Sequence, residues 1–238
     1  MRRMYLSLLA ITAASIFSVQ AQDNEKDRPK VQGSGNVITK DISVQSFDQL
    51  AVSGVFSVQL SQGSKEEVKI EADDNLQPYF EVKNEGSKLI ISTKKDVNIS
   101  SEKKLKVYIT FKKLKSMDLK TVGNVSSEKN LSFDDLQINN KSVGSLDLNL
   151  TAQSVHVDNK SVGDVKLSGK ADNVVIKNKS VGSISAAGFI VQKMDIDNNG
   201  IGSAVVNAEK EIKVKDSFLG KVSNKGAATI KRTEKVRI

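Results

Sequence analysis

The chain has 238 residues, of which 36 are lysine or arginine and 28 are aspartate or glutamate, so its formal net charge is +8. It contains no cysteine, which excludes disulfides, thiolate metal ligands and a lipid anchor on cysteine. It has no tryptophan and only 5% aromatic residues. We therefore expect no nucleic-acid partner despite the basic charge, because single-strand binders stack bases on aromatic side chains.

The first 21 residues have the pattern of a secretory signal peptide. Two arginines precede an apolar run from Tyr5 to about Val19, and small residues lead to a predicted cleavage site after Ala21. The paired arginines leave a twin-arginine signal as an alternative. No other stretch approaches the roughly 18 apolar residues that span a bilayer. We predict an exported protein, periplasmic, secreted or at the cell surface, without a transmembrane segment and not a lipoprotein.

The segment after the predicted cleavage site is polar, and strand patterns follow it. Residues 22–33 are aperiodic and are predicted to form a flexible leader. Residues 34–118 alternate apolar and polar side chains, most clearly at 47–64 and 67–93, but without a constant step. We expect this part to form either wider first coils or a sandwich-like cap, because the end of a solenoid must be covered.

A five-residue stretch then recurs along residues 119–224. "NKSVG" stands at 140–144, 159–163 and 178–182, and "NNGIG" follows at 198–202. The glycines that mark successive repeats are Gly123, Gly144, Gly163, Gly182, Gly202 and Gly220. Their spacings of 21, 19, 19, 20 and 18 residues indicate a solenoid of about twenty residues per coil.

Apolar residues occupy the same places in each repeat and alternate with polar ones, the pattern of a strand with one buried face. Eight before the glycine stand Leu136, Val155, Val174, Met194 and Ile212; six before stand Ile138, Val157, Ile176, Ile196 and Val214; two after stand Leu146, Val165, Ile184, Ala204 and Val222. Each repeat is predicted to hold two short strands joined by the five-residue stretch, plus a return segment. The repeats leave no room for a helix. This favours an all-β, single-stranded parallel β-helix over a leucine-rich repeat or an antiparallel sandwich.

The five-residue stretch is interpreted as the corner between strands. Its asparagines, with one aspartate, are predicted to stack and hydrogen-bond from coil to coil: Asn140, Asn159, Asn178, Asn198 and Asp216. The aliphatic residues before the glycines are predicted to turn inward: Val143, Val162, Val181, Ile201 and Leu219. Glycine is expected where a β-carbon would collide with the neighbouring coil. Residues 225–238 are predicted to cap the C-terminal end.

The segments "FDQLAVSGVFSVQLSQGS", "ADDNL" and "LIIST", followed by the "NKSVG" coils, resemble the head GIN domain family of "putative autotransporter adhesins" (DUF2807), common in Bacteroidetes. The resemblance covers roughly residues 37–225, so we interpret 34–238 as one domain of this type. It implies a right-handed, pectin-lyase-like β-helix and a role in adhesion. A step near eighteen residues would also suit a left-handed hexapeptide helix.

Some parallel β-helices cleave polysaccharides with clustered carboxylates, so outward acidic residues are candidates for a site. The outward column five before the glycine reads Asn139, Asp158, Lys177, Asp197 and Lys215, in which the signs alternate. Asp195 and the single histidine, His156, stand seven before it. Interspersed lysines favour an exposed ion-pair ladder over a metal site or a catalytic site. The acidic pairs at 66–67, 73–74 and 134–135 are interpreted as solvated turns.

Three lysines stand three before successive glycines: Lys141, Lys160 and Lys179. One interpretation is a charged row that prevents association along the corner. The other is a stripe that contacts anionic glycans or lipopolysaccharide. We predict a non-enzymatic β-helical scaffold for adhesion or glycan binding, with no cofactor and with an anionic glycan or envelope component as partner. A polysaccharide-active enzyme or carbohydrate-binding module using Asp158, Asp195 and Asp197, and a structural envelope protein, are the alternatives.

Overall fold

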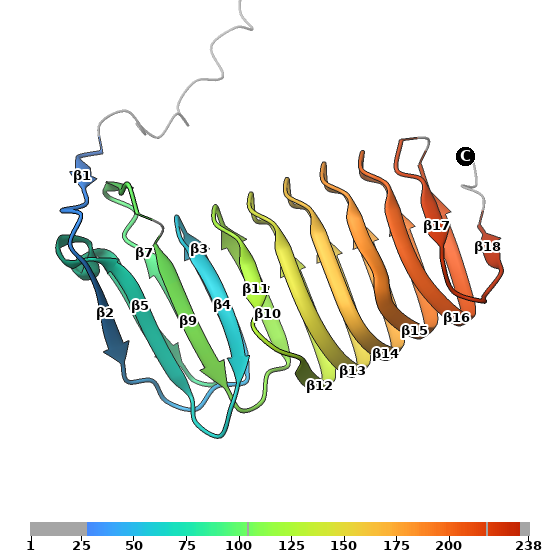
Figure 1. The fold of residues 1–238 in the computed structure, drawn as a ribbon, viewed down its shortest axis with the longest axis horizontal. Coiled ribbons are helices and arrows are strands. Elements are labelled where there is room, and N and C mark those ends of the chain that lie inside the picture. The colour runs from blue at the N-terminus through green and yellow to red at the C-terminus, as the bar shows by residue number, and fades with distance from the viewer. Residues whose placement is uncertain (1–27, 104, 218, 234–238) are drawn as a thin grey trace, which may run out of the picture.

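The computed structural model describes residues 28–103, 105–217 and 219–233 as a nearly all-β solenoid of about six turns, with 64% strand and 3% helix (Figure 1). The predicted all-β fold and its repeat of about twenty residues are therefore confirmed. The predicted signal peptide and the first six residues of the predicted leader lie outside the described residues.

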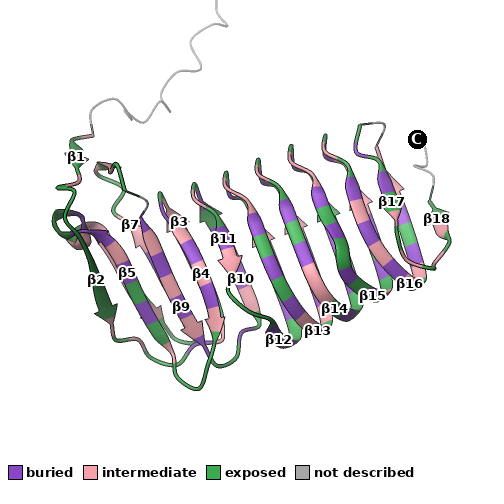
Figure 2. Ribbon diagram, in the orientation of Figure 1, coloured by how far each residue is buried: buried purple, intermediate pink, exposed green. Residues whose placement is uncertain are grey.

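The regular coils stack through parallel strands that lie side by side along the solenoid in Figure 1. These strands are β12 (Leu131–Asn140), β13 (Leu146–Asn159), β14 (Val165–Asn178), β15 (Ile184–Asn198) and β16 (Ala204–Asp216). Their register is the one that the repeat predicts: Leu136, Val155, Val174, Met194 and Ile212 pair in succession. The side chains of this column are buried and their neighbours along each strand are more exposed, and this alternation gives the bands of colour in Figure 2. The core is thus a set of aliphatic columns between the walls of each coil.

The strands of a coil are longer than predicted. Two short strands and a return segment were expected, but β13 and β14 each run unbroken for 14 residues from the position after one corner to the asparagine of the next. The reason is that the return segments also stack in register, as Ala152 pairs with Ala171 and Ala171 with Val191, so the backbone ladder continues through the bend. The corners interrupt it, and the β14–β15 and β15–β16 pairs also contain register shifts.

The N-terminal half continues the coils in an order that differs from the chain order. Its parallel strands are β3 (Gln49–Gly54), β4 (Ser57–Gln62), β7 (Lys88–Thr93), β9 (Lys106–Phe111), β10 (Ser116–Thr121) and β11 (Val125–Ser127). β3 lies between β7 and β10, and β4 lies between β9 and β11. The segment that comes first in sequence is therefore inserted into the stack instead of ending it.

Antiparallel strands close this end of the solenoid. β2 (Val37–Ile42) pairs with β5 (Glu67–Asp73), β5 pairs with β9, and β6 (Phe80–Glu85) pairs with β7. The short 3₁₀ helix η2 (Asp74–Tyr79) connects β5 to β6. The structure thus combines the two expectations for this half, coils and a sheet-like cover.

Short strands at both ends correct or extend the predicted boundaries. β1 (Lys30–Gln32) pairs in parallel with β8 (Asn98–Ser100), so the prediction of a flexible leader as far as residue 33 is wrong for residues 30–32. Val31 packs against the core, and this contact fixes the segment. At the other end, β17 (Val222–Asn224) and β18 (Ile230–Arg232) both pair with β16. Among the described residues, no helix has the length and apolar character needed to cross a membrane.

Candidate functional site

The corner of each coil is built on a buried row of asparagines. Nδ2 of Asn140 donates to Oδ1 of Asn159 at 2.9 Å, Asn159 donates to Asn178 at 2.7 Å, and Asn178 donates to Asn198 at 2.6 Å. All four side chains are buried. Each inner amide both donates and accepts along the stack, so the row fixes the corner of one coil over the corner of the next.

The row ends one coil earlier than predicted. Asn198 donates to the carbonyl of Gly220 at 2.7 Å. Asp216 pairs in register with Asn198, but its carboxylate accepts the backbone N–H of Val222 at 3.1 Å and lies 3.5 Å from the guanidinium of Arg232. The prediction that Asp216 continues the row is therefore wrong, because the Nδ2 group of Asn198 donates to the backbone carbonyls of Gly202 and Gly220 and not to this carboxylate.

A hydroxyl residue lies inside the corner beside these asparagines. The hydroxyls of Ser161 and Ser180 donate to the carbonyls of Gly163 and Gly182, both at 3.0 Å. Thr121 does the same to Gly123 at 2.9 Å. Buried polar groups need such partners. Serine or threonine consequently takes the inward position in the corners that end at Gly123, Gly144, Gly163 and Gly182, and Gly200 takes it in the corner that ends at Gly202.

The neighbours of these hydroxyl residues therefore point outward. The exposed fractions of Val143, Val162, Val181, Ile201 and Leu219 are 52%, 54%, 54%, 59% and 61%. The prediction that these residues fill the corner is wrong. Alternate residues of an extended segment face opposite sides, so placing the hydroxyl inside sends the lysine before it and the aliphatic residue after it into solvent.

The glycine column is required by close approach of the coils. A β-carbon on Gly163 would lie 2.5 Å from the carbonyl oxygen of Gly144, and one on Gly182 would lie 2.4 Å from that of Gly163. Gly220 departs from the column, because its β-carbon would meet the carbonyl oxygen of Gly200. These contacts are with backbone atoms, so no side-chain rotation would relieve them.

The predicted lysines form a row on this corner, and the structure adds a fourth. The backbone N–H of Lys141 donates to the carbonyl of Leu119, which places Lys120 directly beside Lys141; Lys160 and Lys179 follow in the next coils. We call Lys120, Lys141, Lys160 and Lys179 the lysine row; all four are exposed. Lys120 stands three before Gly123, as the others stand three before theirs, so extending the column by one repeat identifies it from sequence.

Only one member of the lysine row forms an ion pair within the described residues. Nζ of Lys160 lies 3.1 Å from Oδ2 of Asp158. Neighbouring coils are about 4.8 Å apart, so the ammonium groups repel one another unless an anion lies along them. The row therefore presents a line of positive charge along the corner.

The acidic candidates lie in the predicted register but do not converge. Asp158, Lys177 and Asp197 pair in succession, so a lysine separates the two carboxylates. Asp197 lies 3.5 Å from Nζ of Lys215. Asp195 pairs with Val175 on one side and with Lys213 on the other. In the described part of the chain, no group of three or more histidine or acidic side chains is placed to hold a metal ion.

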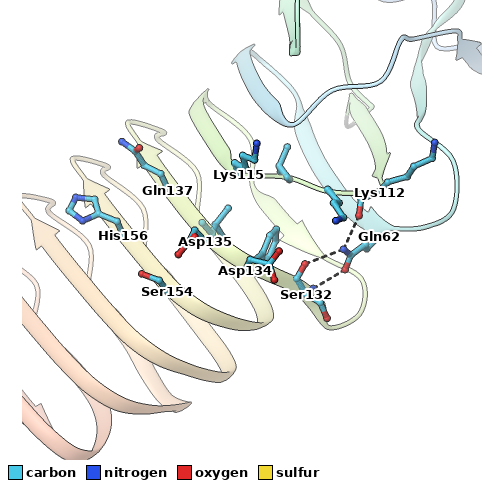
Figure 3. Close-up of a pocket in the computed structure, with 13 residues that line it drawn as sticks. Gln62, Lys112, Lys115, Ser132, Asp134, Asp135, Gln137, Ser154 and His156 are labelled. Carbon is cyan, nitrogen blue, oxygen red and sulfur yellow. Dashed lines mark hydrogen bonds between the residues drawn. The ribbon is translucent and has the colours of Figure 1, made fainter.

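His156 lies on a groove that sequence reasoning missed. The groove has a volume of about 650 Å³ and runs between the β9–β10 loop and the edge of β12 (Figure 3). Its charged lining residues are Lys112, Lys113, Lys115, Asp134, Asp135 and His156. The two sides come from segments about twenty residues apart in sequence, and no local pattern indicates that the loop stands away from the coil.

Two lysines of this groove are held by carboxylates. The hydrogen bond from Lys115, at 2.8 Å, lowers the pKa of Asp48. Burial raises the pKa of Glu66, but the hydrogen bonds from Lys112 and Ser46 outweigh this effect, and the pKa is lowered overall. These ion pairs stabilise the loop at the edge of the groove.

The acidic pairs interpreted as solvated turns differ among themselves. Asp134 and Asp135 are exposed but lie within the strand β12 and not in a turn, so that part of the interpretation is wrong for them. Asp73 is fully buried and accepts the backbone N–H of Gly35 at 2.6 Å. The hydroxyl of Ser101 also donates to Asp73. The turn interpretation is wrong for Asp73, which joins three distant segments.

Comparison with known proteins agrees with this architecture. The family model "Putative auto-transporter adhesin, head GIN domain" matches residues 46–228. A "putative adhesin" from Bacteroides fragilis is 31% identical, covers 85% of this chain and 100% of its own, and superposes with a TM-score of 0.74. A second, from Parabacteroides distasonis, is 22% identical over 86% of this chain and 95% of its own, with a TM-score of 0.61.

A third solved structure, described as a "putative lipid binding protein" from Parabacteroides distasonis, is 19% identical over 86% of this chain and 100% of its own, with a TM-score of 0.54. At this identity the likeness concerns the fold alone. No curated protein matches the chain. The match of the family model over most of the described residues, together with the B. fragilis structure, shows that the chain belongs to the head GIN domain family.

Proposed function

We propose that this protein is an exported, non-enzymatic adhesin that binds an anionic glycan of a cell surface along the lysine row. The observation that carries the proposal is the stacking of Lys120, Lys141, Lys160 and Lys179 on successive coils, all exposed. Family membership supports an adhesin-like role.

The rigidity of the corner supports binding of an extended ligand. The buried asparagine row holds the backbone next to Lys141, Lys160 and Lys179 at a fixed spacing, so little backbone entropy is lost when a repeating polyanion binds. Attraction between exposed charges is weakened by salt, because the Debye length shortens from about 10 Å at 0.1 M to about 3 Å at 1 M. We therefore expect salt-sensitive binding.

Binding to immobilised heparin and polygalacturonate at low and high salt tests the proposal. Replacing Lys141, Lys160 and Lys179 by alanine should weaken binding at low salt by about tenfold, which corresponds to about 1.4 kcal/mol. The matched control replaces Lys170, Lys193 and Lys210, which are also exposed, by alanine and removes the same charge from other positions. Equal losses in both triple variants would show that net charge, not the row, attracts the glycan.

The enzyme alternative has its own measurement. Calcium-dependent cleavage of polygalacturonate that is lost in Asp197→Ala would overturn the non-enzymatic part of the proposal. The ion pair between Asp197 and Lys215, and Lys177 between Asp197 and Asp158, disfavour a carboxylate-bound calcium ion there.

A further inference from the structure

A second row of side chains runs along the same corner, parallel to the lysine row. Hydrogen bonds between successive coils place these residues one above another: Val55, Val122, Val143, Val162, Val181 and Ile201. We call this set the aliphatic row. Its members are between 50% and 59% exposed, and six coils at about 4.8 Å make it roughly 24 Å long.

The two rows together form one amphipathic strip. In the four middle coils a buried hydroxyl residue separates the outward lysine from the outward aliphatic residue, as Ser142 separates Lys141 from Val143, whereas Val55 and Ile201 extend the aliphatic row by one coil at each end without a lysine beside them. Single exposed aliphatic residues are common on protein surfaces, whereas a continuous row of them indicates a surface that is covered in use. Beside the aliphatic row, the residues that follow the corner glycines Gly123 to Gly202 include one acid, Asp164. Beside the lysine row, the outward column contains Asp118, Asp158 and Asp197 together with Lys177.

A groove with both apolar and polar lining extends the strip at its N-terminal end. It has a volume of about 320 Å³, and its lining includes Val55 and Val122 of the aliphatic row together with Phe56, Ile99 and Leu105. Lys103 also lines this groove. The combination of apolar walls and a basic residue therefore continues beyond the last lysine of the row.

We propose that this strip docks on an anionic lipid surface, with the aliphatic row in the acyl boundary and the lysine row against the head groups. Lysine suits this position, because its methylene stem follows apolar surface while its ammonium group reaches the charged layer.

A row one side chain wide is too narrow for a protein interface, which buries about 800 Å² on each partner. A second copy would bring two lysine rows together. A soluble glycan gives no role to aliphatic side chains. The inference rests on the proposed function in one respect, since the same lysines supply the electrostatic attraction.

Co-sedimentation of the full chain with vesicles tests the inference. The probes are phosphatidylcholine vesicles with and without about 30% phosphatidylglycerol, because anionic head groups attract basic side chains. We expect binding to the anionic vesicles alone. Val143, Val162 and Val181 are replaced together by threonine, which keeps the shape and the strand propensity, and binding should weaken by at least about tenfold as apolar burial is lost. Circular dichroism establishes that the variant is folded.

The matched control replaces Val175 and Ile190 by threonine, since they are exposed aliphatic residues away from the strip, and should bind as the unmodified chain does. Unchanged vesicle binding by the Val143/Val162/Val181 variant would overturn the inference. So would binding to heparin without binding to vesicles, or a self-association in sedimentation velocity that this variant abolishes. Vesicle binding with no affinity for heparin or polygalacturonate would instead overturn the proposed glycan function and leave the lipid inference standing.

Discussion

A buried amide in the corner of a coil has no water nearby to replace a lost hydrogen-bond partner. Single residues there therefore contribute more to the stability of the fold than their size suggests. Asn159 accepts from Asn140 and donates to Asn178, and all three are buried. Removing its amide leaves one donor and one acceptor without a partner in the interior. At this scale the corner is specified by hydrogen bonding and not by apolar packing.

Asn159→Ala should lower the free energy of unfolding by about 2–4 kcal/mol, because two buried polar groups lose their partners. Urea denaturation followed by circular dichroism measures the change. Asn173→Ala is the control, since Asn173 is exposed, and it should change stability by less than about 0.5 kcal/mol. Equal effects of the two substitutions would show that the amide row does not stabilise the corner.

A second prediction concerns the corner glycines. Gly163→Ala should destabilise the protein by about 1–3 kcal/mol, because the new β-carbon meets backbone atoms and the coils must separate. Gly188→Ala is the counterpart, as its β-carbon would meet only Ser168 at 3.8 Å, an ordinary contact. Thermal denaturation of both variants compares them, and a Gly163→Ala variant as stable as Gly188→Ala would contradict the requirement for close approach.

Between elements, the outward faces of neighbouring strands are joined by polar side chains. On β10, Asp118 lies 3.0 Å from Nζ of Lys88 and accepts from Nδ2 of Asn139 at 2.8 Å. Burial raises the pKa of Asp118, but the hydrogen bonds from Asn139 and Lys88 and the charge of Lys88 outweigh this effect, so the pKa is lowered overall. The folded chain thus binds this proton less readily than the unfolded chain.

This pKa shift gives a pH dependence with a definite sign. The carboxylate contributes stability above its unfolded pKa of about 3.9, and the contribution is lost as the pH falls through the lower folded value. The Asp118→Asn variant should therefore have a lower free energy of unfolding than the unmodified chain at about pH 5. Between about pH 5 and about pH 3, its free energy of unfolding should fall by less than that of the unmodified chain. Urea denaturation at both pH values measures this, with Asp172→Asn as an exposed control. Parallel curves for the unmodified chain and Asp118→Asn would contradict it.

At the scale of the whole molecule, each end of the stack needs a cover for its backbone groups. β2, β5 and β6 run antiparallel at the N-terminal end, and β17 and β18 cover two parts of β16 at the other. An uncovered edge strand is a template for pairing with another chain. The stack therefore depends on these short strands more than their length suggests.

Ending the chain after Asn224 removes β18 and should expose the Ile212–Val214 edge of β16, so we expect concentration-dependent oligomers and a lower thermal midpoint. Size-exclusion chromatography and differential scanning calorimetry measure the two effects. A chain that ends at Thr233 keeps both strands and serves as control. If the shorter chain keeps the elution volume and midpoint of the control, β18 does not protect the end.

The charged columns on the coils and the groove at His156 differ in how far the sequence predicts them. The columns of lysine and acidic residues follow from counting back from each glycine, and the same count reaches Lys120. The groove at His156 does not follow, because it depends on how far the β9–β10 loop stands from β12. The direction of Val143 was also mispredicted, since apolar character alone does not show that serine is needed inside to satisfy the buried polar groups of the corner.

The sequence by itself determined the coil: its step, its buried columns and its corner, because each coil packs on a near copy of itself and the pattern repeats with the contacts. Only the tertiary structure decided the order of the N-terminal strands, the burial of Asp73 and the exposure of the aliphatic row. These features depend on contacts between segments that do not repeat, or on competition between polar and apolar groups for the same interior. Periodicity carries no information about either.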